Sequence, residues 1–271
     1  MPQHFVFGLM AVLALVPASV AAYGRIGADR PVRPGGLFWG LLFLAAAGPV
    51  VWSLVQLGGI WRTGVSATLW VSIASCMVLF LALCAATASA WRLSPLLLPY
   101  LAALGVLALL TAGSGGTVLR PSAPWIWVDL HIAVSVVTYA LLTLGAVAAL
   151  AAFLQDRALR TKRPNSLSRA LPSLADAERL QMWLLSASAV VLGVGLVTGI
   201  AVQYLGTGRV IAIDHKVLFS FAAFAAIAGL VAAHAVSGVR GRRAARIALL
   251  AYLLLTLGYP GVKFVTGVLM G

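Results

Sequence analysis

The chain has 271 residues, of which 62% are hydrophobic and only 9% are charged. Its mean hydropathy of +1.04 is typical of a protein that resides in a lipid bilayer. Nineteen Lys and Arg residues against six Asp and Glu residues give a formal net charge of +13. Because the basic residues flank apolar runs instead of gathering in a soluble domain, we do not expect nucleic acid as a partner.

Roughly eight apolar runs can each cross about 30 Å of hydrocarbon. They cover residues 3–23, 37–57, 67–87, 95–112, 131–154, 181–204, 213–237 and 245–269. These runs are continuously rich in Leu, Ala and Val, whereas lipid-facing β-strands alternate apolar and polar residues. The sequence therefore predicts an all-α fold, a polytopic membrane helix bundle of about eight transmembrane helices. We divide it into an N-terminal half, 1–112, and a C-terminal half, 113–271, with four helices each.

The basic residues predict the orientation of this bundle. Arg62, Arg120, Arg209 and Lys216 lie on one side, with Lys263 inside the last run. The other 14 lie in the alternate connections: Arg25, Arg30, Arg33, Arg92, six between Arg157 and Arg179, Arg240, Arg242, Arg243 and Arg246. By the positive-inside rule these 14 face the cytoplasm, and both termini lie outside a bacterial cytoplasmic (inner) membrane. We expect the first run to be retained, because no Lys or Arg precedes it as in a signal peptide.

Two connections are long, one on each side. The cytoplasmic one, about 155–180, is interrupted by Pro164 and Pro172 and can form short interfacial helices. Its basic residues can attract anionic lipid or, alternatively, dock a partner protein. The outer one, about 113–130, is irregular by its glycines and prolines and ends with Trp125 and Trp127. These indoles can form an ordinary aromatic belt or an apolar platform for a flat macrocycle.

Two of the four histidines form a matched pair. His131 and His215 each open a long apolar run at the predicted outer face, whereas His4 and His234 lie near span ends where an interfacial role suffices. Polar groups at that depth are costly unless they are used or satisfied. Each imidazole of the pair can cap a helix end or bond a backbone carbonyl, or the two can ligate one metal. In the second case non-covalent haem b is favoured over zinc, because no third His or Cys accompanies the pair and the pocket is apolar. Arg120, Arg209 and Lys216, on the same face, can pair with haem propionates.

Several blocks of the second half also resemble one family, the cytochrome c assembly and haem-handling membrane proteins of the CcsA/CcmC/HemX type. The chain looks closest to the HemX/YpjD-like branch. The matching blocks are Trp127-Val128-Asp129-Leu130-His131-Ile132 with Ser135 and Tyr139, Leu171-Pro172-Ser173-Leu174, Glu178-Arg179-Leu180, Thr198-Gly199, His215-Lys216, Gly241-Arg242-Arg243-Ala244-Ala245 and Gly261-Val262-Lys263-Phe264-Val265.

The resemblance implies a haem-associated protein of cytochrome c maturation or haem supply, in which His131 matches the family's first outward-facing histidine. The chain departs from the synthetase subunits of that family. Residues 202–214, which follow Thr198-Gly199, contain no tryptophan, and no further histidine follows Phe264. We therefore do not expect this chain itself to ligate haem to an apocytochrome.

Three functions follow from these patterns. The leading one is a haem-binding accessory or carrier in cytochrome c assembly or haem delivery, with cytochrome c maturation proteins as partners. The alternative is a non-enzymatic regulator or scaffold for haem-synthesis enzymes that acts through residues 155–180. A transporter is less supported, because every Asp and Glu lies in a loop or at a span end. No nucleotide-binding, hydrolase or metalloprotease motif occurs, so we do not expect an enzyme.

Overall fold

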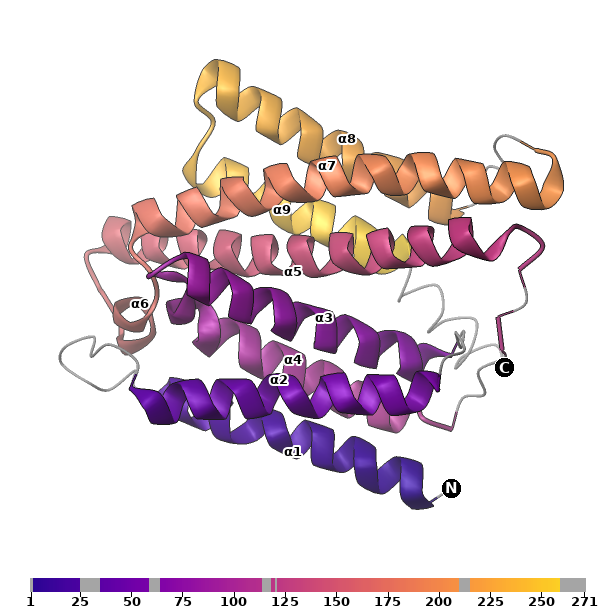
Figure 1. Cartoon of the computed structure of the whole chain (residues 1–271). Helices are drawn as coiled ribbons and strands as arrows, with labels where there is room; N and C mark the ends of the chain where they lie inside the picture. The colour runs from indigo at the N-terminus through magenta and orange to yellow at the C-terminus, as the bar shows by residue number, and fades with distance from the viewer. Residues whose placement is uncertain are drawn as a thin grey trace.

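The structure is a computed structural model that describes residues 2–24, 35–58, 64–113, 118–119, 121–209 and 215–258. The side chains of residues 2–5, 215 and 216 lie outside this description, as do Arg120 and Lys263. The described residues form helices that lie side by side as a bundle (Figure 1).

Four helices make up the N-terminal part of the bundle. They are α1 (Pro2–Gly24), α2 (Gly36–Leu57), α3 (Val65–Ala86) and α4 (Ser94–Leu110), with the 3-10 turn η1 (Ala90–Leu93) leading into α4. Helix α1 packs against α2 and α4, and α3 packs against α2 and α4. The side chains of Leu15, Leu42, Ile73 and Leu101 are fully buried where these helices meet.

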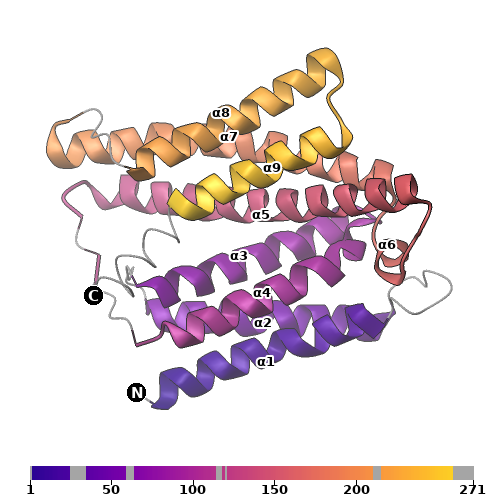
Figure 2. The ribbon, with the colours of Figure 1, turned by 180° about the vertical axis from the view of Figure 1, so that it is seen from behind.

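The C-terminal part is built on two very long helices. These are α5 (Trp125–Thr161) and α7 (Leu174–Thr207), joined through the short α6 (Ser166–Ala170). At 1.5 Å per residue they are about 55 and 51 Å long, well beyond the 30 Å of a bilayer core. The helices α8 (His215–Ser237) and α9 (Gly241–Thr256) complete this part, and Figure 2 shows them in front of α7. Helix α5 packs on α3 as well as on α7 and α9, so it joins the two parts.

The polytopic helical bundle predicted from the sequence is confirmed. Among the described residues, seven helical segments are long and apolar enough to cross a membrane: Val6–Gly24, Gly36–Leu57, Val65–Ala86, Ala90–Leu110, Trp125–Thr161, Leu174–Thr207 and Val217–Ser237. The eighth apolar run, 245–269, is described only as far as residue 258, by α9 and the turn that follows it.

The predicted start of the fifth span at residue 131 is wrong. Helix α5 begins at Trp125, directly after Pro124, so Trp125 and Trp127 belong to its first turn and His131 lies in the second. The sequence prediction began the span after Asp129 because it required a continuous run of apolar residues. A helix needs only its own backbone hydrogen bonds, and a polar residue on its surface does not end it. For the same reason α7 extends from 174 to 207 and not from 181 to 204.

The described cations gather at one end of the bundle. Figure 1 shows the end of α5, α6, the start of α7, η1 and the turn between α8 and α9 at this end, which we call the basic end. Of the Lys and Arg residues whose side chains are described, Arg209 alone lies at the opposite end. This segregation is the one that the sequence pattern predicts for a cytoplasmic face.

The connection at the basic end is folded against the helices. The Gln155 side-chain amide donates hydrogen bonds to the carbonyls of Ser168 and Pro172, both at 2.7 Å. The Asn165 side chain accepts from the Ser168 amide at 2.7 Å and caps α6, and Leu171 is buried. One short helix therefore forms where interfacial helices were predicted, while the second predicted segment, from Leu174, is the first turn of α7.

Candidate functional site

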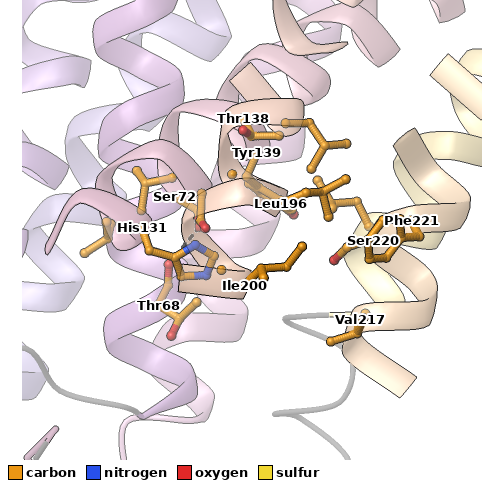
Figure 3. A pocket seen from close by; sticks show the side chains of 18 of the residues that line it. Thr68, Ser72, His131, Thr138, Tyr139, Leu196, Ile200, Val217, Ser220 and Phe221 are labelled. Carbon is orange, nitrogen blue, oxygen red and sulfur yellow. Dashed lines mark hydrogen bonds between the residues drawn. The ribbon is translucent and has the colours of Figure 1, made fainter. Parts of the chain in front are cut away.

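A cavity of about 340 Å³ lies between α3, α5, α7 and α8, in the half of the bundle away from the basic end. Its volume is at the lower end of the range for small-molecule pockets. Apolar side chains form most of the wall, including Leu192, Leu196 and Phe221. The polar groups that line it are few: Thr68 and Ser72 of α3, His131, Ser135, Thr138 and Tyr139 of α5, Gln203 of α7 and Ser220 of α8. Figure 3 shows the His131 ring beside Thr68, with Ser220 and Phe221 across the cavity.

The hydrogen bonds of His131 define which ring nitrogen is protonated. Its Nδ1 lies 3.1 Å from the Thr198 hydroxyl oxygen, and that hydroxyl donates its own hydrogen to the Gly195 carbonyl at 3.0 Å. With its one hydrogen directed to the Gly195 carbonyl, the Thr198 hydroxyl accepts from His131, and this arrangement favours the tautomer with the proton on Nδ1. The lone pair is then on Nε2. This is the tautomer in which a histidine ligates a metal while its other nitrogen is held by a partner.

Two glycines allow α7 to approach this ring. Gly195 and Gly199 are spaced four residues apart on α7, with Thr198 between them. A Cβ at position 199 would lie 3.0 Å from His131 Cε1, and one at position 195 would lie 3.3 Å from Val134 Cγ1. Small residues at this spacing are typical of closely packed membrane helices. Here Gly199 leaves room for the His131 ring, and Gly195 leaves room for the neighbouring Val134.

The second predicted ligand, His215, is the first residue of α8, and its side chain lies outside the described residues. The next two turns of the same helix contribute Val217, Ser220 and Phe221 to the wall of the cavity. The structure therefore brings the start of α8 to the cavity that His131 lines. Ligation by His215 stays a prediction, as does the role of Lys216, whose side chain also lies outside the described residues.

The other predicted site residues do not line this cavity in the described structure. Trp125 and Trp127 are 50% and 38% exposed on the first turn of α5. Arg209 is exposed just beyond the end of α7, and Arg120 lies outside the described residues. At the basic end, His234 donates from Nδ1 to the Val239 carbonyl at 2.9 Å, which ties the turn between α8 and α9.

Sequence reasoning missed a cluster of three tyrosines. The Tyr139 hydroxyl, at the cavity wall, lies 3.2 Å from the Tyr252 hydroxyl, which is also hydrogen-bonded to the Tyr100 hydroxyl. The three residues come from α5, α9 and α4. A signal was present, because tyrosines inside apolar runs need hydrogen-bond partners at that depth. The i, i+4 pair Thr68 and Ser72 likewise marked the face of α3 that lines the cavity.

The described residues fit one axial ligand of a haem. An imidazole with its Nε2 lone pair free lines a mainly apolar cavity, which is the donor and the environment that non-covalent haem requires. Within the described part of the chain, no three His, Cys, Asp or Glu residues cluster as a zinc site would need.

Comparisons with known proteins identify the family of the chain. The model of a family described as "Cytochrome C assembly protein" matches residues 40–269, a range that begins in α2 and contains every residue lining the cavity. An Azospirillum brasilense protein, described as "Uncharacterized 28.8 kDa protein in nifR3-like 5'region", is 57% identical over 271 residues, which is all of both chains. No solved structure matches the chain. The protein is thus a multi-pass membrane protein that belongs to the cytochrome c assembly protein family, and this membership links it to cytochrome c biogenesis.

Proposed function

We propose that this protein holds haem b non-covalently near the outer face of a bacterial cytoplasmic membrane, as an accessory in cytochrome c assembly or haem delivery. His131 is one axial ligand and His215 is the other. The observation that carries the proposal is the place of His131 at the wall of a mainly apolar cavity, with Nδ1 hydrogen-bonded to Thr198 in an arrangement that favours Nε2 as the ligand atom.

The residues suit retention of haem more than catalysis on it. His131 and His215 would hold the haem iron as two imidazole ligands, which would leave no coordination site for a substrate. Bound haem supplies a redox-active iron. The protein's own groups position and enclose it: Thr198 orients His131, and the apolar wall excludes water. Arg209, at the end of the bundle nearest His131, together with Arg120 and Lys216, provides positive charge for the propionates.

Haem content tests the proposal directly. We expect protein purified in mild detergent to contain haem, and expect His131→Ala to lower the haem per chain strongly. The matched control is His234→Gln, which alters a histidine at the basic end. Equal haem content in wild type, His131→Ala and His234→Gln would refute ligation by His131.

The alternative function, a regulator or scaffold for haem-synthesis enzymes, is favoured by one observation. The connection between α5 and α7 is held in place by Gln155 and presents Lys162, Arg163 and Arg169 on its exposed side. A fixed basic surface can dock an acidic partner. If it does, reversing these three charges to Glu abolishes capture of the partner and leaves haem content unchanged. Capture that survives the charge reversal counts against the scaffold.

A further inference from the structure

A second cavity lies in the basic half of the bundle, away from His131. Helices α3 and α7 both pack on α5, but they make few contacts with each other. Between them is a cavity of about 650 Å³, which we call the α3–α7 groove. Its walls and floor are apolar and include Leu79, Leu83, Leu141, Leu144, Trp183 and Leu184.

The groove is open to the surroundings of the bundle. Trp183 on the α7 side is 60% exposed, and Ala82 and Ala86 on the α3 side are also exposed. All three belong to segments that qualify as membrane spans, Val65–Ala86 and Leu174–Thr207. An opening between two membrane-spanning helices faces lipid, so a lipid chain is the neighbour at highest concentration there.

The groove leads to a cationic mouth at the basic end. A cavity of about 380 Å³ adjoins it and shares Thr87, Ala88 and Arg179 with it. The mouth holds Arg92, whose guanidinium carbon lies 5.7 Å from the centroid of the Trp91 ring. Arg179 and Asp176 lie there as well, paired at 3.0 Å between Nη2 and Oδ1.

The mouth can bind an additional anion. Two arginines against one aspartate leave a net positive charge, and the Arg179 side chain is 75% exposed despite its pairing. A guanidinium has five N–H donors, so Arg179 retains donors for a second acceptor after bonding Asp176. Both arginines have the fork geometry that suits phosphate oxygens.

From this combination we propose that the α3–α7 groove binds one anionic phospholipid. An acyl chain lies along the leucines of α3, α5 and α7, and the phosphate sits between Arg92 and Arg179. Basic pockets between transmembrane helices, on the side that carries the positive charges, recognise anionic headgroups in this way. From Thr87 to Leu79 the wall formed by α3 is about 12 Å long, enough for much of an acyl chain.

Native mass spectrometry of the full chain in detergent tests the proposal with phosphatidylglycerol as the probe. We expect wild type to retain one phosphatidylglycerol and to retain phosphatidylcholine less well. In the Arg92→Gln/Arg179→Gln double variant, phosphatidylglycerol affinity should fall roughly 30-fold, from the attraction of two charges near the surface. The matched control is Lys162→Gln/Arg163→Gln, which removes two charges from the same end outside the groove.

A second variant tests the groove without changing charge. Ala82→Phe places a ring in the apolar part of the groove and should lower retention of phosphatidylglycerol. The haem content and the helical circular dichroism of this variant should equal those of wild type. The proposal is overturned if the arginine variant and its control retain the lipid equally, if phosphatidylcholine is retained as well as phosphatidylglycerol, or if Ala82→Phe has no effect on retention.

Discussion

Thr198 orients the His131 ring through a hydrogen bond to Nδ1. Without a partner, a neutral imidazole in an apolar cavity can carry its proton on either ring nitrogen. With Thr198 donating to Gly195 and accepting from His131 Nδ1, one tautomer and one ring orientation are selected. Position 199 must also be glycine for the His131 ring to fit, because a side chain there would contact the ring.

We predict that Thr198→Val lowers haem affinity by about 10- to 100-fold. This is the usual effect of losing a partner that orients a metal ligand. Val has a similar shape, so the packing of α7 is preserved. Thr198→Ser is the control, because it keeps the hydroxyl, and its affinity should stay near that of wild type. Haem titration followed by absorbance measures both. A Val variant that binds like wild type would show that the hydrogen bond is irrelevant to binding.

Gly199→Ala is predicted to weaken haem binding by displacing the ring. The added Cβ lies 3.0 Å from His131 Cε1, closer than ordinary van der Waals contact. The control is Gly229→Ala on α8, where nothing lies within 4 Å of the added Cβ. We expect haem titration to show lower affinity for Gly199→Ala alone. An equal loss in both variants would mean that helix rigidity, and not the contact with His131, is responsible.

At the scale of elements, α5 organises the molecule. It contacts α3, α7 and α9, carries His131 and Tyr139, and at its other end carries Gln155, which holds the α5–α7 connection. Its apolar surface spans the membrane, and its ends extend beyond. One continuous helix thus links the cavity to the basic end.

Gln155→Ala is predicted to loosen the α5–α7 connection. The variant removes both 2.7 Å hydrogen bonds to the Ser168 and Pro172 carbonyls. Each is worth about 1 kcal/mol. We expect faster tryptic cleavage at Lys162 and Arg169 with unchanged haem content. Thr161→Val, which removes an exposed hydroxyl at the end of α5, is the control. Cleavage at the wild-type rate would show that other contacts hold the connection.

At the scale of the whole molecule, the tyrosine cluster joins the two parts of the bundle. Tyr100 belongs to α4, whereas Tyr139 and Tyr252 belong to α5 and α9. Tyr252 bonds both of the others, so it is the centre of the cluster.

Tyr252→Phe is predicted to lower the free energy of unfolding by about 1–3 kcal/mol, because both partner hydroxyls lose their shared partner in a buried site. Thermal unfolding in detergent followed by circular dichroism measures the change. Tyr204→Phe, at a residue that is 54% exposed on α7, is the control and should melt like wild type. Equal melting temperatures for the two variants would contradict a structural role for the cluster.

The sequence predicted the bundle because hydropathy alone specifies helical spans and charge specifies their ends. It also singled out His131 from its depth and its neighbours. It did not predict Thr198 as the partner of His131, because that contact joins residues 67 positions apart and depends on how α5 and α7 pack. It placed Trp125 and Trp127 in the outer connection because Pro121 and Pro124 disfavour a regular helix and the prediction required a continuously apolar span, whereas Pro124 directly precedes α5. The sequence did not predict the α3–α7 groove either, because the groove depends on how α3 and α7 pack on α5.

The central claim is that Nε2 of His131 ligates haem iron, and imidazole rescue tests it most directly. The measurement is the absorption spectrum of purified His131→Gly protein reconstituted with haem, with and without added imidazole. The account predicts that the low-spin bands of wild type are lost in the variant and return when imidazole enters the space left by the side chain. A variant whose spectrum equals that of wild type before imidazole is added would contradict the account.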